Sequence, residues 1–287
     1  MHVVLGATGH LGTAVARSLL DRGEPVTVVT RSPEKARTWE SDGVLAAVVD
    51  VHDIEALRAM LPEGGRLFAL NPPADPTGGD TDAEENRTGD AIAAAIRGAG
   101  LERVVALSTY GAQPGTRIGD LGTLYRFEQH LTDLHTPVAV VRVAYLLSNW
   151  DGVLPPARDD GVLPAMLDER SPIPMVAPAD VGVAVADLLT RPEPATGLHF
   201  VEGPERYSPA DVAQAFAAAL GRPVDVTVTP REGWVAAFRG MGFSAEAAES
   251  YAGMTALATN GEIELPDAPT RGSTTLQDYV EALVRNA

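Results

Sequence analysis

The sequence predicts an α/β fold in which a doubly wound parallel sheet is followed by a smaller second part. Short apolar, β-branched runs alternate with helical segments up to residue 143. Strands that alternate with helices of this length form a parallel sheet covered on both faces. A turn with three glycines, Gly6, Gly9 and Gly12, joins the first run to the first helix. Beyond residue 145, prolines and glycines break the alternation, which marks the second part.

The elements of the first part follow one another in regular order. We expect strands at residues 2–5, 25–30, 45–49, 66–70, 103–108 and 138–143. Helices are expected between them, at residues 13–22, 33–41, 54–61, 83–99 and 123–135. In such a sheet the ligand binds in the crevice beyond the carboxyl ends of the strands.

The second part carries its own helix signals. Ser208 is a capping residue, Pro209 suits the first helical position, and Asp211 lies near the positive end of the helix dipole. This helix is expected to end at Gly221. A short strand should follow at residues 224–228, with further helices at residues 234–239, 245–257 and 276–284.

The glycine turn indicates a dinucleotide site. Gly6 allows a tight turn, Gly9 lets the backbone approach a pyrophosphate, and Gly12 lets the helix pack closely on the strand. The free N–H groups at the helix N-terminus then face the phosphates. The residues of this turn expected to bind the cofactor are Gly6, Thr8, Gly9, His10, Leu11 and Gly12.

The end of the second strand indicates which dinucleotide binds. An acidic residue there would hold the ribose 2′-hydroxyl, whereas an arginine accommodates a 2′-phosphate. The strand ends in Arg31-Ser32, a guanidinium and a hydroxyl that can both bind phosphate. Lys35 can add a second positive charge. We therefore predict NADP(H) rather than NAD(H); the alternative is that Arg31 and Lys35 are ordinary surface residues.

Composition excludes several classes of function. The chain has 287 residues, no cysteine and a formal net charge of −17. It therefore has no disulfide or thiolate metal site, and its six histidines show no metal-binding spacing. The negative charge disfavours nucleic acid and membrane surfaces as partners. With no run of about 20 apolar residues and no signal peptide before the first strand, we expect a cytoplasmic protein, with a homodimer as an open alternative.

Several segments resemble the NmrA-like branch of the short-chain dehydrogenase/reductase superfamily. The resemblance rests on the G-x-x-G-x-x-G spacing, on LSTYGA at residues 107–112, on VVRVAYLLSN at residues 140–149 and on PADVG at residues 178–182. It implies a Rossmann core that binds NAD(P) at residues 1–150. Residues 151–287 are then expected to form a C-terminal α/β substrate lobe, some segments of which return to the core.

The resemblance also implies further cofactor contacts. An aspartate followed by an apolar residue after the third strand contacts the adenine in this superfamily, which implies that role for Asp50 and Val51. The turn after the fourth strand passes the adenosine ribose, which implies that role for Asn71 and Pro72. For Asp50, the alternative is a helix cap.

The usual proton-transfer residues are incomplete. The resemblance places Ser108 and Tyr110 beside the nicotinamide, and in most short-chain enzymes the next helix carries Tyr-x-x-x-Lys. The nearest match here begins at Tyr125 and ends at Gln129, and Lys35 is the single lysine of the chain. A tyrosine with a pKa of about 10 is a weak base near neutrality. Tyr125, Ser108 and Tyr110 are the candidate catalytic residues; Tyr125 can alternatively be a packing residue.

The candidate substrate-binding residues are aromatic or polar side chains near or within the second part. They are Tyr110, Tyr145, Asn149, Trp234 and Phe238. For the aromatic residues of the lobe, the alternative is a place in its core. Asp180, which follows Pro178, is expected to cap a helix rather than to act on substrate.

These features predict an NADPH-dependent oxidoreductase that transfers a hydride to a small conjugated acceptor such as a quinone or an enone. Quinone reduction gives a stabilised oxyanion that solvent can protonate, so it does not require the missing lysine. One alternative is an NADP(H)-binding redox sensor without turnover. Another is a tailoring enzyme of natural-product biosynthesis with reductive or non-redox chemistry.

Overall fold

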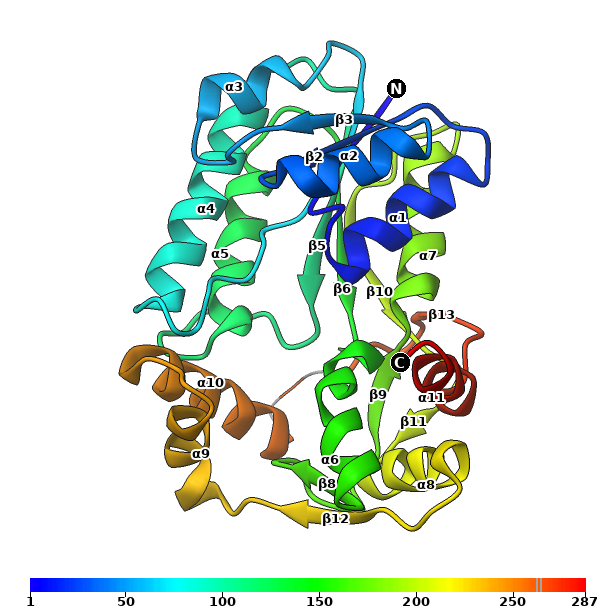
Figure 1. Ribbon diagram of the computed structural model, residues 1–287. Coiled ribbons are helices and arrows are strands. Elements are labelled where there is room, and N and C mark those ends of the chain that lie inside the picture. Colours follow the sequence, from blue (N-terminus) through cyan, green and yellow to red (C-terminus); the bar gives the residue numbers. More distant parts are fainter. Residues whose placement is uncertain (262, 264) are drawn as a thin grey trace.

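The computed structural model describes residues 1–261, 263 and 265–287, and its main element is a parallel sheet (Figure 1). Within these residues the sheet has eight strands in the order β13-β10-β6-β5-β4-β1-β2-β3. The neighbouring strands pair in parallel, and the order reverses between β1 and β4. The doubly wound fold is confirmed. The strands are β1 (His2–Leu5), β2 (Val26–Thr30), β3 (Leu45–Val48), β4 (Arg66–Ala69), β5 (Arg103–Thr109), β6 (Val138–Val143), β10 (Gly197–Glu202) and β13 (Thr270–Arg271).

Helices cover both faces of this sheet (Figure 1). One face carries two helices that lie side by side, α1 (His10–Leu20) and α7 (Pro178–Thr190). The other face carries α3 (Ile54–Ala59), α4 (Thr81–Ile96) and α5 (Asp120–Thr132), and α2 (Pro33–Ser41) packs on β2 and β3. In the described part of the chain, no helix is long and apolar enough to cross a membrane.

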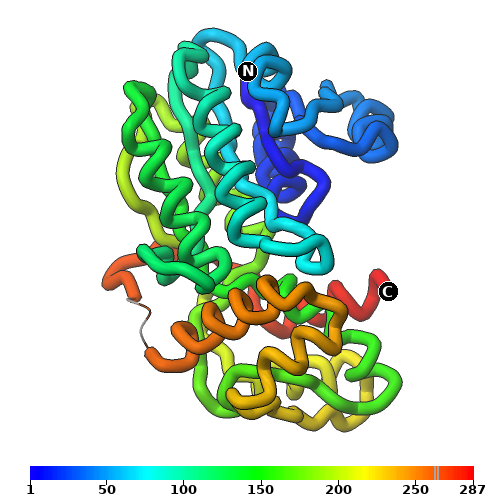
Figure 2. Tube along the Cα trace, turned by 90° about the vertical axis from the view of Figure 1, so that its left-hand side faces the viewer, coloured from blue at the N-terminus to red at the C-terminus, as the bar shows by residue number. Residues whose placement is uncertain are grey.

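A lobe of short elements lies beneath the carboxyl ends of the strands (Figures 1 and 2). Its described residues form two small sheets, β11-β9-β7 and β12-β8. It has its own core, which includes Trp150, Phe216 and Leu276. The lobe elements are β7 (Tyr145–Leu146), the 3-10 helices η1 (Leu147–Val153) and η2 (Arg231–Gly233), α6 (Leu154–Asp159), β8 (Val162–Ala165), β9 (Ile173–Val176), β11 (Arg206–Tyr207), α8 (Pro209–Leu220), β12 (Asp225–Val228), α9 (Trp234–Gly240), α10 (Ala245–Thr259) and α11 (Leu276–Arg285).

The chain crosses between the sheet and the lobe several times. The buried residues Val181, Val185 and Leu189 of α7 and Val201 of β10 belong to the core of the large sheet. β10 pairs with β6, and β13 extends the same sheet. The lobe is therefore built from segments that both precede and follow α7 and β10.

Residues 145–178, expected to be irregular, contain five regular elements from β7 to β9. Pro155 and Pro156 lie in the first turn of α6, where a missing N–H costs nothing. Several helix boundaries also differ from expectation, most clearly the starts of α1 and α5. α1 begins at His10, and α5 begins at Asp120, directly after Gly119 with φ 53°.

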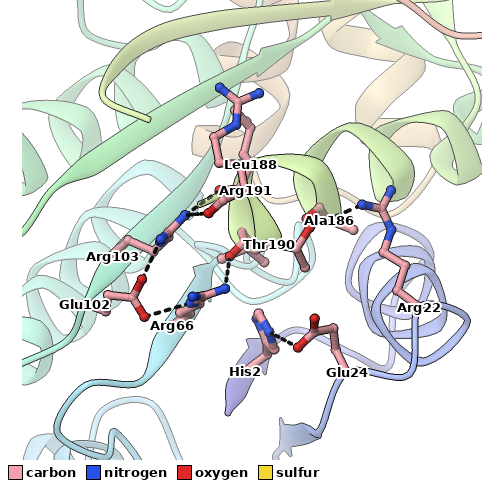
Figure 3. A network of polar contacts seen from close by, with 11 residues as sticks. His2, Arg22, Glu24, Arg66, Glu102, Arg103, Ala186, Leu188, Thr190 and Arg191 are labelled. Carbon is pink, nitrogen blue, oxygen red and sulfur yellow. Dashed lines mark hydrogen bonds and ion pairs between the residues drawn. The ribbon is translucent and has the colours of Figure 1, made fainter. Parts of the chain in front are cut away.

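Arginines from the amino ends of the strands bind the C-terminus of α7 (Figure 3). The Arg103 side chain is buried, and its guanidinium donates to the carbonyls of Leu188 and Arg191 and to Glu102. Arg66 donates to the Leu189 carbonyl at 2.9 Å and to the same glutamate at 2.8 Å. These cations satisfy carbonyls that a helix end leaves unpaired and complement its dipole.

The crossing of α1 and α7 depends on Gly182. A Cβ atom at this position would lie 2.6 Å from the backbone carbonyl carbon and oxygen of Ala14. The two helices approach so closely because one of them has no side chain at the contact.

Substitution Gly182→Ala should push α1 and α7 apart and lower the free energy of unfolding by about 2–3 kcal/mol, the cost of overpacking a core. Gly240→Ala is the matched control, because a Cβ atom there meets nothing within 4 Å. Urea denaturation of the three proteins measures the effect. Equal stability of Gly182→Ala and wild type would show that the crossing tolerates a side chain.

Candidate functional site

The glycine turn between β1 and α1 is built as a tight cradle. Gly6 has a φ of 69°, and the Gly9 N–H donates to the Gly6 carbonyl at 3.0 Å. A Cβ atom on Gly12 would lie 2.3 Å from that carbonyl oxygen, so only glycine allows this approach. A Cβ atom on Gly9 would find its nearest neighbour only at 3.8 Å. The outer side of the turn is therefore open to a ligand.

The N-terminus of α1 offers unpaired donors. Its N-cap is Gly9, which makes no side-chain cap hydrogen bond, and its first turn contains no acid. The N–H groups of the first turn of a helix have no partner within the helix. His10 is the first helical residue, and its side chain is 63% exposed. This end of α1 suits an anion, as the pyrophosphate of a dinucleotide requires.

Helix α2 is held against the back of the turn. The Trp39 indole N–H donates to the Ala7 carbonyl at 2.9 Å, and the Lys35 ammonium donates to the Thr8 carbonyl at 3.3 Å. Arg17 lies over the Trp39 ring at 4.5 Å. The Lys35 ammonium therefore lies beside the glycine turn, where a bound cofactor would contact the protein.

Arg31 follows β2 at the same edge of the sheet. Its side chain is exposed and, in the described part of the chain, makes no hydrogen bond or ion pair. The Ser32 hydroxyl accepts the Lys35 backbone N–H at 3.2 Å and caps α2. Its proton stays available for donation to a phosphate. Arg31 is thus a cation at this edge of the sheet with no ion-pair partner among the described residues.

A cleft of about 550 Å³ opens next to Arg31. Val51, His52 and Pro72 line it together with residues from the β4–α4 loop and α4. Asp50 does not cap α3, whose cap is Asp53; it accepts the backbone N–H of His52 at 3.0 Å and contacts the imidazole at 3.1 Å. The backbone N–H of His52 is the main cause that lowers the Asp50 pKa. Nothing in the local sequence pattern had indicated His52 as part of this cleft.

Asn71 lies buried at the end of β4. Its amide N–H donates to the Glu85 carbonyl at 3.0 Å, whereas its oxygen has no hydrogen-bond partner among the described residues. An orphaned buried oxygen at the point where the strand order reverses fits a missing hydroxyl ligand. Together, the open turn, the unpaired Arg31 and this oxygen fit an anionic dinucleotide.

Ser108 binds a neighbouring carboxylate. Its hydroxyl donates to Glu128 of α5 at 2.5 Å. Arg142 of β6 donates two hydrogen bonds to the same carboxylate, at 2.8 and 2.7 Å. Ser108 and Glu128 are both buried. The hydroxyl expected beside the nicotinamide is therefore engaged in a network that ties α5 to β5 and β6.

Tyr110 is enclosed between β6 and β10. Its ring is 5% exposed and stacks edge-on to Phe200 at 5.7 Å. Burial and the nearby Glu202 carboxylate raise its pKa well above the usual range. Glu202 in turn pairs with Arg271 of β13 at 2.6 Å. Tyr110 stays a proposed site residue, but this structure encloses its hydroxyl rather than exposing it to an acceptor.

The turn of α5 that precedes Glu128 carries no cation directed toward the sheet. Leu124 is buried, Tyr125 is half-buried, and Arg126 is exposed and pairs with Asp90 at 2.8 Å. No hydrogen bond is present for the Tyr125 hydroxyl in the described part of the chain. Arg126 points away from Tyr125 toward α4 and so cannot replace the missing lysine.

The candidate substrate residues fall into two places. The phenol of Tyr145 lies near the exposed Asn149, and burial raises the pKa of this phenol to about 12. Trp234 and Phe238 are buried in a separate small cluster on α9 and α10, with Phe243 stacked on Phe238 at 5.3 Å. The structure brings Tyr145 and Asn149 together and places the other two in the lobe core.

Asp180 does not cap α7. The N-cap is Ala177, and the Asp180 carboxylate accepts the backbone N–H of Thr274 at 2.9 Å and its hydroxyl at 3.1 Å. The expectation of a cap is wrong, because a partner far along the chain takes the carboxylate. Asp180 instead fixes the segment that leads into α11.

A buried carboxyl group, not indicated by the sequence pattern, joins α4, α5 and the β4–α4 loop. Glu85 accepts the Ala74 N–H at 3.1 Å and the Thr123 hydroxyl at 2.8 Å. Burial, and then the nearby Asp120, raise its pKa to about 7. Among the described residues, no group of histidines and acids could hold a metal ion.

The fold and the glycine turn together define the Rossmann class of α/β proteins. Within this class, the chain belongs to the NmrA-like family, because residues 2–265 match that family. The family match covers most of the lobe as well as the large sheet, since it continues through α10.

Three known proteins are similar to this chain. It is 26% identical to an NAD(P)H azoreductase of Xenophilus azovorans over 258 residues, covering 90% of this chain and 87% of the relative. An NADPH-dependent quinone oxidoreductase from Escherichia coli, solved with NADPH, aligns with a TM-score of 0.80 at 22% identity over 99% of both chains. A Citrobacter sp. triphenylmethane reductase, solved with NADP(H), aligns with a TM-score of 0.83 at 18% identity over 99% of this chain and 100% of its own. The two solved structures confirm the fold.

Glu85 should make stability depend on pH. The pKa of Glu85 in the folded protein, about 7, lies above the usual value of 4.5. Its contribution to the free energy of unfolding is therefore full below pH 4.5 and is lost as the pH rises through 7. The Glu85→Gln variant cannot ionise at this position, so its stability should not fall as the pH rises through 7. Between pH 5 and pH 8, its free energy of unfolding should therefore increase relative to that of wild type by about 2 kcal/mol. Denaturation at both pH values measures this, with exposed Glu40→Gln as the control. A difference that does not change with pH would contradict the raised pKa.

Proposed function

We propose that the protein is an NADPH-dependent oxidoreductase that transfers a hydride to a small conjugated acceptor such as a quinone. The observation that carries the proposal is the open glycine turn at the uncapped N-terminus of α1, with the unpaired Arg31 at the same edge of the sheet. Similarity to an NAD(P)H azoreductase and to quinone and dye reductases supports it.

The residues at this edge divide the work of holding the cofactor. The first-turn N–H groups of α1 would hold the pyrophosphate. Arg31, Ser32 and Lys35 would hold the 2′-phosphate, and the cleft at Val51 and Pro72 would take the adenosine. When bound, the nicotinamide supplies the hydride, so the protein has to position donor and acceptor and exclude water.

The chemistry is expected to favour acceptors that need little acid–base help. Arg126 is turned toward Asp90, Ser108 toward Glu128, and Tyr125 has no neighbouring lysine. Oxidation of an alcohol requires a base that removes the hydroxyl proton. Reduction of a quinone gives a stabilised anion that water can protonate. The arrangement therefore supports reduction of conjugated acceptors over alcohol oxidation.

Purified protein should oxidise NADPH in the presence of benzoquinones or azo dyes, followed by the loss of absorbance of the reduced nicotinamide. Secondary alcohols with NADP⁺ should react at least about 100-fold more slowly, the range that a general base contributes. Tight binding of NADPH with no turnover of any acceptor would contradict the enzyme and favour a binding protein.

Arg31→Ala should lose preference for the phosphorylated cofactor. Loss of a charge-assisted pair to phosphate costs about 1.5–3 kcal/mol, or roughly 10- to 100-fold in affinity. Calorimetry should show this loss for NADPH and little change for NADH. Arg37→Ala is the matched control, because Arg37 is exposed on α2 and lacks partners among the described residues. Equal losses for both cofactors would assign Arg31 another function.

A further inference from the structure

Asp151 of η1 lies between the glycine turn and the C-terminal helix. Its Oδ2 atom is 3.7 Å from Nε2 of His10, the first residue of α1. Its Oδ1 atom accepts the hydroxyl of Tyr279 on α11 at 2.8 Å. The Asp151 side chain is 24% exposed, so water shields its charge only in part. The Asp151 carboxylate of η1 therefore contacts both α1, which packs on the large sheet, and α11 of the lobe.

The position of this charge relative to α1 is unusual for a dinucleotide site. α1 has no acid in its first turn and no side-chain cap, which leaves its positive end free for an anion. Asp151 brings a negative charge to this end from the lobe. The pyrophosphate of a cofactor would bind at the same end. The two anions would repel each other, because like charges at one helix end interact where solvent is partly excluded.

Asp151 also belongs to the segment that carries the candidate acceptor residues. Asn149, two residues earlier, lies near the phenol of Tyr145. Trp150 is buried and lies 5.9 Å from the Tyr145 ring. The Asp151 charge therefore lies on the same turn as Asn149, which is expected to meet the acceptor.

We propose that Asp151 is a positioning residue that binds His10 and opposes the pyrophosphate, so that it lowers the affinity for NADP(H). The inference rests on the proposed function, since it requires that the cofactor binds at α1. The energy of the repulsion favours release of the cofactor after each turnover. Asp151 needs no contact with the reacting atoms for this effect.

The test measures binding by calorimetry at pH 8 in low salt. Asp151→Asn removes the charge but keeps an oxygen that can accept from Tyr279, and it should bind NADPH about fivefold more tightly than wild type. The gain should shrink as salt is raised to about 0.5 M, because salt screens the repulsion. 2′-Phospho-ADP-ribose, which contains the pyrophosphate, should show the same gain. 2′-AMP, which lacks it, should show none.

Two further variants serve as controls. Asp160→Asn removes an equal charge from an exposed side chain at the end of α6 and should leave the affinity unchanged. Tyr279→Phe removes the hydrogen bond to Asp151 but leaves its charge, so it should not reproduce the gain.

Unchanged or weaker NADPH binding by Asp151→Asn, while wild type binds NADPH, would overturn this inference alone. A gain in 2′-AMP binding, or an equal gain in Tyr279→Phe, would also overturn it, because both would indicate a structural effect rather than repulsion. Failure of wild type to bind NADPH at all would overturn the proposed function and this inference with it.

Discussion

The close packing of α1 is the constraint on which both the site and the lobe depend. At its start, Gly12 lies against the Gly6 carbonyl, which aims the first-turn N–H groups outward. Two residues on, Ala14 meets Gly182 of α7. A Cβ atom on Gly12 or on Gly182 would collide with the backbone that it faces. α7 in turn follows directly on β9 of the lobe. The position of the lobe beneath the sheet is thus set by the same helix that presents its N-terminus to a ligand.

The other end of α7 is held by charge rather than by shape. The buried Arg103 would be costly alone, but its N–H groups meet helix carbonyls and the Glu102 carboxylate. Arg66 likewise donates to a carbonyl of α7 and to Glu102. Arg22 of the α1–β2 turn pairs with Asp187 of α7 at 2.6 Å. Glycine contacts near one end and arginines at the other fix α7 on the sheet. The Asp180–Thr274 bonds then transmit this fixed position to the segment before α11.

Local pattern predicted what depends on local interactions. Strands β1 to β6 and helices such as α8, with its capping box and Gly221 at its end, are encoded by neighbours in sequence. In the lobe, β12 was predicted, whereas β7, β9 and β11 escaped prediction because they pair across long stretches of chain and are only two to four residues long. The candidate site was predicted only in part for the same reason, the distance in sequence between contacting residues. The turn and Arg31 are recognisable in sequence, whereas the Ser108–Glu128 bond, 20 residues apart, and the Asp180–Thr274 bond, 94 apart, arise only from the fold.

A chain with a net charge of −17 can still hold a strongly anionic cofactor, because only nearby charges decide the potential at the site. At physiological ionic strength, exposed charges more than about 8 Å apart are largely screened. Close to the glycine turn the structure places helix N–H groups and Lys35, with Arg31 at the adjacent strand end and the Asp151 carboxylate 3.7 Å from His10. The carboxyl groups elsewhere, such as Glu85, are buried in hydrogen bonds or dispersed over the surface. Under the proposed function, affinity for the cofactor depends on a few residues around α1 rather than on the net charge of the chain.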